Sequence, residues 1–211
     1  MDCYLTGKTI IIDAYGWSDL LLGVVIGAIK PPNPMIMERR IPTSSFQPPN
    51  FKEKKYLTDA IKIADEIIAV MQPDNETCFN VRSEYVLSSA IPHLQKKGFK
   101  VQKVDSTGEL AQQVEMAYLR WCMEKGVPKE LLQDKRRFYR FLEWVGEFPH
   151  VRESLVKTGW ASWENKWRQE IFKKQTIPLK LKTGFFRFEQ FNRTINLIIE
   201  LEVLFAAKSS S

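Results

Sequence analysis

The sequence predicts an α/β fold, in which a mixed five-stranded sheet is flanked by helices and followed by a mainly helical C-terminal extension. Three strand-like segments joined by short links come first, and strands joined in this way form an antiparallel meander. Two further strand-like segments are connected through helical segments, and such crossovers make strands parallel. We therefore expect residues 1–126 to form the α/β domain and residues 127–211 to form the extension.

The meander is predicted from three segments rich in apolar and β-branched residues. A turn that contains Gly16 separates the first two segments, and the prolines of residues 31–34 stop the second and set up a reversal. Gly23 and Gly27 fall within the second segment, where they permit close packing. The three segments are Lys8–Asp13, Asp19–Lys30 and Met35–Ile41.

The rest of the α/β domain alternates helices with strands. Apolar residues recur at spacings of three and four from Tyr56 to Met71, which is the clearest helical pattern in the chain. Ser106 and Glu109 have the S-x-x-E spacing of a capping box ahead of the domain's last helix, which Gly126 closes. Between these helices we expect a strand at Glu76–Arg82, a helix at Tyr85–Lys97 and a strand at Phe99–Val104.

The extension has helical patterns that are less regular. Apolar residues of Lys129–Trp144 lie near helical spacing, and Trp160, Trp163 and Trp167 are three and four residues apart, so that they share one face of a helix. A last helix is expected over residues 188–201, although residues 195–205 are equally typical of a strand.

Charge is unevenly distributed along the chain. The net charge is +6, but residues 1–118 carry a net charge of −1 and residues 119–211 a net charge of +7, together with five of the six tryptophans. This asymmetry favours an anionic partner. Basic side chains interleaved with aromatic rings bind phosphates and stack on bases, whereas a helical core of tryptophans under a solvated basic face gives the same pattern. The candidates for nucleic-acid contact are Lys135, Arg136, Arg137, Arg140, Trp160, Trp163 and Trp167.

Several classes of protein are disfavoured by the composition. The three cysteines, Cys3, Cys78 and Cys122, are far apart, which argues against a disulfide framework and a CxxC-type zinc site and fits a reducing compartment. The longest apolar run, Leu20–Ile29, is too short to span a bilayer, and we see no secretory signal. No GxGxxG or P-loop motif occurs, and the two histidines are distant from each other, which disfavours a catalytic triad. We expect a cytoplasmic protein without a membrane partner.

Three acidic residues follow strands whose carboxyl ends should meet. Asp13 ends the first strand, Glu84 follows the fourth, and Asp105 follows the fifth. Ligands of open α/β sheets bind at the edge formed by the carboxyl ends of parallel strands, and a cluster of carboxylates there suits Mg²⁺ or Mn²⁺. Structural roles are the alternative: Asp13 precedes a turn, Glu84 complements a helix N-terminus, and Asp105 and Glu109 cap the next helix.

Over residues 8–125 the chain resembles the ribonuclease H-like superfamily, which includes Holliday-junction resolvases and type 2 ribonucleases H. The resemblance rests on the element order and on the segments IIIDAYGW, N-V-R-S-E and V-D-S-T-G-E. It implies that Asp13 is a metal ligand on the first strand and that Glu84 is a second acid. It also implies a third acid at Asp105, Glu109 or Glu115, and hydrolysis of DNA or RNA that depends on a divalent metal.

Two functions follow as hypotheses. The first is a metal-dependent nuclease, in which Asp13 with one or two of Glu84, Asp105 and Glu109 holds Mg²⁺ or Mn²⁺, which activates water. The second is a catalytically inactive module of the same fold, which binds nucleic acid or a protein partner through the basic, tryptophan-rich extension. The two differ in whether the acidic side chains come together at one edge of the sheet.

Overall fold

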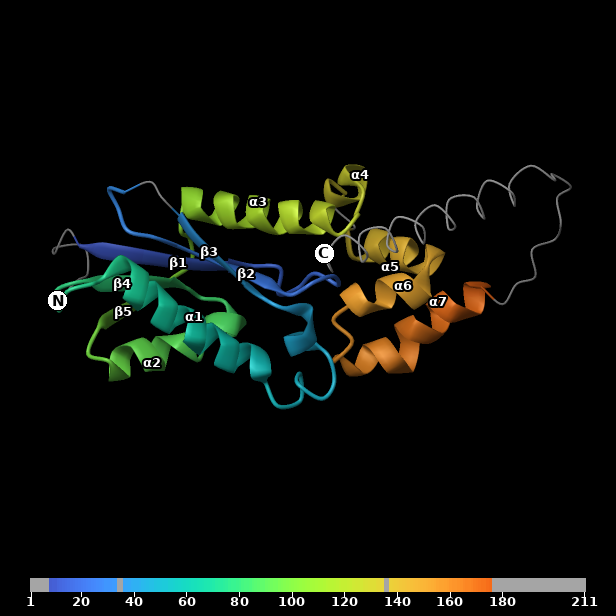
Figure 1. Ribbon diagram of the computed structural model, residues 1–211, viewed down its shortest axis with the longest axis horizontal. Coiled ribbons are helices and arrows are strands. Elements are labelled where there is room, and N and C mark those ends of the chain that lie inside the picture. Colours follow the sequence, from blue (N-terminus) through green and yellow to red (C-terminus); the bar gives the residue numbers. More distant parts are fainter. Residues whose placement is uncertain (1–7, 34–35, 135–136, 176–211) are drawn as a thin grey trace, which may run out of the picture. The chain divides into compact units, whose positions relative to one another are not determined.

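The computed structural model describes residues 8–33, 36–134 and 137–175, which belong to one compact unit, Met1–Gln175. Within these residues five strands form a sheet: β1 (Thr9–Tyr15), β2 (Val24–Ile29), β3 (Ile36–Ile41), β4 (Cys78–Arg82) and β5 (Lys100–Val104). Their order in the sheet is β3-β2-β1-β4-β5 (Figure 1). β2 is antiparallel to β1 and β3, whereas β4 is parallel to β1 and β5. This confirms the predicted mixed sheet and its ribonuclease H-like arrangement.

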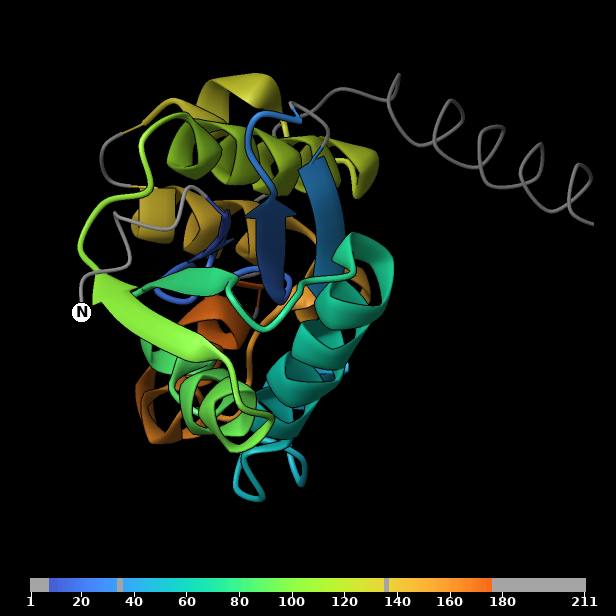
Figure 2. The same cartoon turned by 90° about the vertical axis from the view of Figure 1, so that its left-hand side faces the viewer.

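The two faces of the sheet are covered by three helices, which are α1 (Lys55–Met71), α2 (Ala90–Lys96) and α3 (Glu109–Glu124). α1 and α2 lie on one face and α3 lies on the other (Figure 2). Side chains alternate along β1, so that Ile10 and Ile12 enter the core beneath α1 and α2, while Ile11 packs toward α3. The sheet is therefore the middle layer of three.

The segment after α3 contains short helices, which are α4 (Lys129–Leu132), α5 (Arg137–Glu147), α6 (Pro149–Arg152), a 3-10 turn (Glu153–Leu155), a π-helix (Trp163–Trp167) and α7 (Arg168–Gln175). Phe141, Trp144 and Trp163 belong to the same buried cluster as Tyr118 and Trp121 of α3. This cluster joins side chains from both sides of residue 126, so the described part of the extension packs against α3.

The second strand is shorter than predicted and begins only at Val24. The residues before it bond to the segment after α6 instead of to β1. The Leu22 backbone N–H donates to the Leu155 carbonyl (2.7 Å), and the Lys157 backbone N–H donates to the Leu20 carbonyl (3.0 Å). Leu22 has a φ of 58°, a left-handed conformation that interrupts the extended backbone of a strand.

The helix predicted for Tyr85–Lys97 is divided in the structure. Tyr85–Leu87 form a 3-10 turn, and α2 begins only at Ala90. Pro92 explains the late start, because proline has no N–H to donate and its ring clashes with a preceding helical turn. Proline is tolerated in the first turn of a helix, so the helix has to begin close to Pro92.

The capping box predicted for α3 does not form. The N-cap of α3 is Gly108, and no side chain caps the first turn of the helix. Gly108 has a φ of 60°, which glycine adopts without the strain that a side chain would cause. The Ser106 hydroxyl accepts a long hydrogen bond (3.4 Å) from the Gly108 N–H and does not reach the helix.

The extension also differs from its predicted helices. The helix expected at Lys129–Trp144 is two helices, α4 and α5, and the tryptophan-bearing helix contains the π-helical turn Trp163–Trp167. A π-turn widens the helix by one residue per hydrogen-bonded ring. The last helix or strand expected within residues 188–205 lies outside the described residues.

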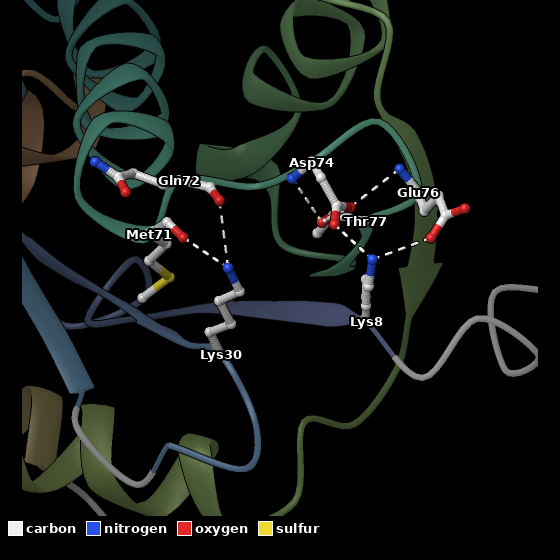
Figure 3. Close-up of polar contacts among 7 residues, drawn as sticks. All are labelled: Lys8, Lys30, Met71, Gln72, Asp74, Glu76 and Thr77. Atoms are coloured by element: carbon white, nitrogen blue, oxygen red, sulfur yellow. Dashed lines mark hydrogen bonds and ion pairs between the residues drawn. The ribbon is translucent and has the colours of Figure 1, made fainter.

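At one end of the sheet, two lysines bind the C-terminus of α1 and the loop that follows it (Figure 3). The Lys8 ammonium group donates to the carboxylates of Asp74 (2.7 Å) and Glu76 (3.0 Å). The Lys30 ammonium group donates to the Met71 carbonyl at the C-terminus of α1 (2.8 Å), where a cation complements the helix dipole. This end lies opposite the carboxyl ends of β1, β4 and β5, where the sequence predicts a site.

The cysteines give a different result from the one expected. Cys78 takes part in a disulfide bond, whereas Cys122 is free and buried, and burial raises the pKa of the Cys122 thiol to about 12. The odd number of cysteines therefore does not exclude a disulfide, and it no longer supports a reducing compartment. None of the helices in the described ranges has both the length and the apolar character that crossing a membrane requires.

Candidate functional site

Asp13 lies on the central strand and is almost completely buried, with 4% of its surface exposed. The sequence predicted that Asp13 is the last residue of the first strand. In the structure β1 continues two residues further, to Tyr15. The Oδ1 of Asp13 accepts a hydrogen bond from the Ala14 backbone N–H (2.6 Å), and its Oδ2 accepts one from the Thr107 hydroxyl. Both carboxylate oxygens therefore have donors inside the protein, and one of these donors ties β1 to the loop before α3.

The other candidate acids do not join Asp13. Glu84 lies after β4, with its Oε1 4.0 Å from the Nε of Arg82. Asp105 and Glu109 are exposed at the start of the α3 segment. In the part of the chain that the structure describes, no three His, Cys, Asp or Glu side chains are grouped so that they could hold a metal ion. The three-carboxylate set of Asp13, Glu84 and Asp105 is therefore not assembled.

The donors present do not fit Mg²⁺ or Mn²⁺. These ions require several oxygen ligands in near-octahedral geometry, and two-metal phosphodiester chemistry requires carboxylates that converge on both ions. Asp13 is buried against its own hydrogen-bond donors. Glu115, the third acid that the resemblance allows, accepts a hydrogen bond from the Tyr15 hydroxyl (2.8 Å). No step of a reaction is therefore assigned to a metal ion at this position.

A hydrogen-bonded group that the sequence analysis missed lies just beyond the end of β1. We call it the Arg137 network; it consists of Tyr15, Asp19, Glu115 and Arg137. The Arg137 guanidinium donates to Asp19 Oδ1 (3.0 Å) and to the Tyr15 hydroxyl (2.6 Å), and this hydroxyl donates to Glu115 (2.8 Å). A pocket of about 620 Å³ opens beside three of these residues, Asp19, Glu115 and Arg137.

Burial controls the ionisation of this network. Burial raises the pKa of the Tyr15 phenol to about 12, and the hydrogen bond to Glu115 acts in the same direction. Burial also raises the pKa of Asp19, although Arg137 opposes the shift. Asp19 and Arg137 are 118 positions apart in the chain, so no local spacing pattern could have identified the pair. The nearest signal was the turn after Asp13, which the sequence analysis interpreted only as a link between strands.

The Lys157 side chain binds the backbone carbonyls of the turn between β1 and β2. This side chain is fully buried, and its ammonium group donates to the carbonyls of Gly16, Trp17 (3.3 Å) and Asp19 (2.9 Å). Burial lowers the pKa of Lys157 to about 7. The sequence does not indicate this role, because lysine is typical of a solvated surface.

The basic residues predicted to contact nucleic acid are engaged with the protein's own acids where the structure describes them. Arg137 belongs to the network above. Arg140 donates to Asp134 (2.9 Å) and to Glu143 (3.0 Å). Lys135 and Arg136 lie outside the described residues.

The tryptophans predicted to contact nucleic acid pack mainly against other side chains of the protein. Trp163 is 1% exposed, and its indole N–H donates to Glu153 (3.2 Å), so its ring cannot stack on a base in this conformation. Trp167 is partly exposed and packs edge-on against Phe138 and Tyr139. Trp160 is also partly exposed. Of the three, Trp160 and Trp167 keep surface that a partner could contact.

These features define an α/β protein with the ribonuclease H-like strand arrangement and no assembled carboxylate site in its described residues. No model of a known protein family matches the sequence, and no curated protein matches it significantly. Among solved structures, the chain is similar to the catalytic core domain of BIV integrase, with 11% sequence identity and a TM-score of 0.32, over 79% of this chain and 95% of that chain. A similarity this low says nothing about activity. The fold is assigned from the order and direction of the strands instead.

Proposed function

We propose that this chain is a catalytically inactive module of the ribonuclease H-like fold that binds a protein partner. The proposal is carried by Asp13, the acid in the position where the resemblance places a metal ligand. Its carboxylate is buried, and its two oxygens accept hydrogen bonds from Ala14 and Thr107. Carboxylates that hold a catalytic metal keep lone pairs directed at the ion and converge with other acids. Asp13 instead acts as a structural acceptor that positions α3.

Ion pairs in the extension favour protein over nucleic acid as the partner. Arg140 is paired with Asp134 and Glu143, and Arg152 is paired with Glu147 (2.7 Å). A phosphate group would have to displace these carboxylates, which reduces the counterion release that drives nucleic-acid binding.

Exposed apolar side chains in the same region also favour a protein partner. Tyr139 is 57% exposed, Phe148 50% and Val151 73%. Large apolar side chains on a surface mark interaction sites, and aromatic side chains are enriched in protein–protein interfaces. These residues lie on α5, after it, and on α6, so the helical extension provides the proposed binding surface.

The first experiment tests for hydrolysis. The full chain is incubated with labelled single-stranded and double-stranded DNA, RNA and RNA–DNA hybrid, in buffer with Mg²⁺ or with Mn²⁺. We expect no cleavage, and no rise in melting temperature when either metal is added, because the described residues contain no group of three side chains that could hold it. Cleavage by the wild type that disappears in Asp13→Asn would establish the nuclease hypothesis instead.

The second experiment tests the class of partner. Fluorescence anisotropy with the same labelled nucleic acids measures binding at low and at moderate salt. We expect at most weak binding that disappears as salt is raised, since the arginines in the described part of the extension are paired with acidic side chains. Tight binding with a steep salt dependence, reduced by Arg140→Gln, would make nucleic acid the partner and contradict the proposal.

A further inference from the structure

A groove runs between α5 and α7, and it has an apolar floor. Leu142, Gly146 and Ile171 form the floor, and Tyr139 and Trp167 stand at its sides. The groove has a volume of about 480 Å³, which is enough for one or two large apolar side chains. We call it the α5–α7 groove. Its α5 residues are three or four positions apart and therefore form one continuous face of the helix.

The π-helical turn contributes to the shape of this groove. Trp163 at its start is buried in the core, whereas Trp167 at its end lines the groove. The wider π-turn changes the rotation between the two rings relative to a regular α-helix. The Trp167 ring also contacts Phe138 and Tyr139, with centroid distances of 5.5 Å and 6.1 Å. An aromatic wall is thus held in place along the groove.

The rim of the groove is acidic. Glu143 and Glu147 of α5 and Glu170 of α7 line it beside the apolar residues. Glu143 and Glu147 are paired with arginines, yet their side chains remain 59% and 61% exposed, and Glu170 is exposed as well. The Lys166 ammonium group lies 4.1 Å from the centroid of the Trp167 ring, a cation–π contact within the protein.

We infer that the α5–α7 groove binds a basic amphipathic helix of a partner protein. Apolar side chains of that helix occupy the floor between Tyr139 and Trp167, and its lysines or arginines face Glu143, Glu147 and Glu170. This is the helix-in-groove mode of recognition, in which apolar side chains give affinity and flanking charges give specificity. The inference deepens the proposed function, since it names the chemistry of the partner.

The test uses a synthetic, fluorescein-labelled amphipathic peptide of leucine and lysine as the probe, and its leucine–glutamate counterpart as the matched negative probe. Anisotropy titrations with the full chain should show saturable binding of the lysine peptide that weakens as salt is added. The glutamate peptide should not bind. Equal binding of the two peptides, or no binding of the lysine peptide, would overturn the inference.

Variants locate the binding to the groove. Gly146→Leu places a side chain over the floor, and an added Cβ at this position lies 3.7 Å from Ile171, an ordinary contact distance. Because leucine also favours helix more than glycine does, the variant should remain folded, which urea unfolding checks, and yet lose binding. A Gly146→Leu protein that binds the lysine peptide as tightly as the wild type would contradict the inference without any ambiguity from folding.

Two milder variants separate the apolar and the charged contributions. Tyr139→Ala should weaken binding about tenfold or more, as expected of an aromatic anchor. Glu170→Gln should weaken it only about twofold to fivefold and reduce its salt dependence, as expected of an exposed charge. The controls are Tyr85→Ala, an exposed tyrosine elsewhere, and Glu53→Gln, an exposed glutamate before α1. Controls that weaken binding as much as the groove variants would refute the assignment.

The outcome is independent of the nuclease assay. If the groove does not bind the lysine peptide but no hydrolysis is seen, the inactive module stands and only the chemistry of its partner is wrong. If hydrolysis that depends on Asp13 is found, the proposed function fails, whereas peptide binding at the groove remains a separate result. The two failures can therefore be told apart.

Discussion

Asp13 of β1 lies directly opposite Gly27 of β2 in the antiparallel register of the two strands. Both positions face α3, because the Asp13 carboxylate accepts a hydrogen bond from Thr107 just before that helix, and a Cβ at Gly27 would meet Val114 of α3. The bare backbone at Gly27 thus permits α3 to lie close to the sheet, beside a buried acid. The position of Gly27 within a strand predicts this packing role.

Gly27→Ala should destabilise the protein by about 1–3 kcal/mol, the usual cost of overpacking a core. The added Cβ would lie 2.3 Å from Val114 Cγ2, so α3 has to move away from β2. Urea unfolding measures the change. In the double variant Gly27→Ala/Val114→Ala the loss should be smaller than the sum of the two single losses, because the clash is removed; strict additivity would show that the contact is not the cause.

Thr107→Val should cost about 1–3 kcal/mol, because it leaves the buried Asp13 carboxylate without one of its donors. Thr107→Ser retains the hydroxyl and should lose less than Thr107→Val. Thermal or urea unfolding of both variants provides the measurement. If serine and valine are equally destabilising, then the methyl group rather than the hydroxyl matters at this position.

Arg137→Met should destabilise by roughly 3 kcal/mol, because Asp19 is then left as a buried carboxylate without its cation. Adding Asp19→Asn should restore part of the loss, since the unpaired charge is removed. Arg140→Met is the matched control: the Arg140 side chain is 49% exposed, and its pairs should contribute less than about 1 kcal/mol. A loss at Arg140 as large as that at Arg137 would argue against the network.

Lys157 should make stability rise with pH. Its folded pKa of about 7 lies below its usual value of 10.5, so between these values the unfolded chain binds more protons than the folded one. The free energy of unfolding therefore increases with pH in this window, by at most about 1.4 kcal/mol per pH unit. Lys157→Met should lack this component.

The measurement compares wild type and Lys157→Met by urea unfolding at several values of pH above 7. The cysteine and tyrosine groups that titrate at higher pH are present in both proteins, so their contributions cancel in the difference. A difference in stability that is constant across the window would show that Lys157 keeps an ordinary pKa in the folded protein.

The sheet could be predicted from the sequence because its determinants are local. Short links after Asp13 and Lys30 require antiparallel neighbours, and helices between later strands require crossovers. The helix over Tyr56–Met71 was predicted because its apolar spacing is regular, and its face, including Ala60 and Ile67, is indeed buried. The start of α2 was placed too early because it depends on a single residue, Pro92.

The candidate site could not be predicted in the same way. A carboxylate near a strand end is compatible with a metal ligand and with an internal acceptor. For Asp13 the two are distinguished by its burial and its two donors, one of which, Thr107, is distant in the chain. The hydrogen bonds of the Arg137 network and of Lys157 join residues a hundred or more positions apart. The sequence contains these residues, but it does not indicate which distant turn each of them approaches.

The role of Lys157 limits how the chain can be shortened. The ammonium group that closes the turn after β1 comes from residue 157, far beyond the last strand of the sheet. A fragment that stopped at residue 126 would lack the Lys157 donor to the carbonyls of that turn and would expose the side of α3 that packs against the extension. A truncated protein that is to keep the geometry of β1 therefore has to extend beyond Lys157.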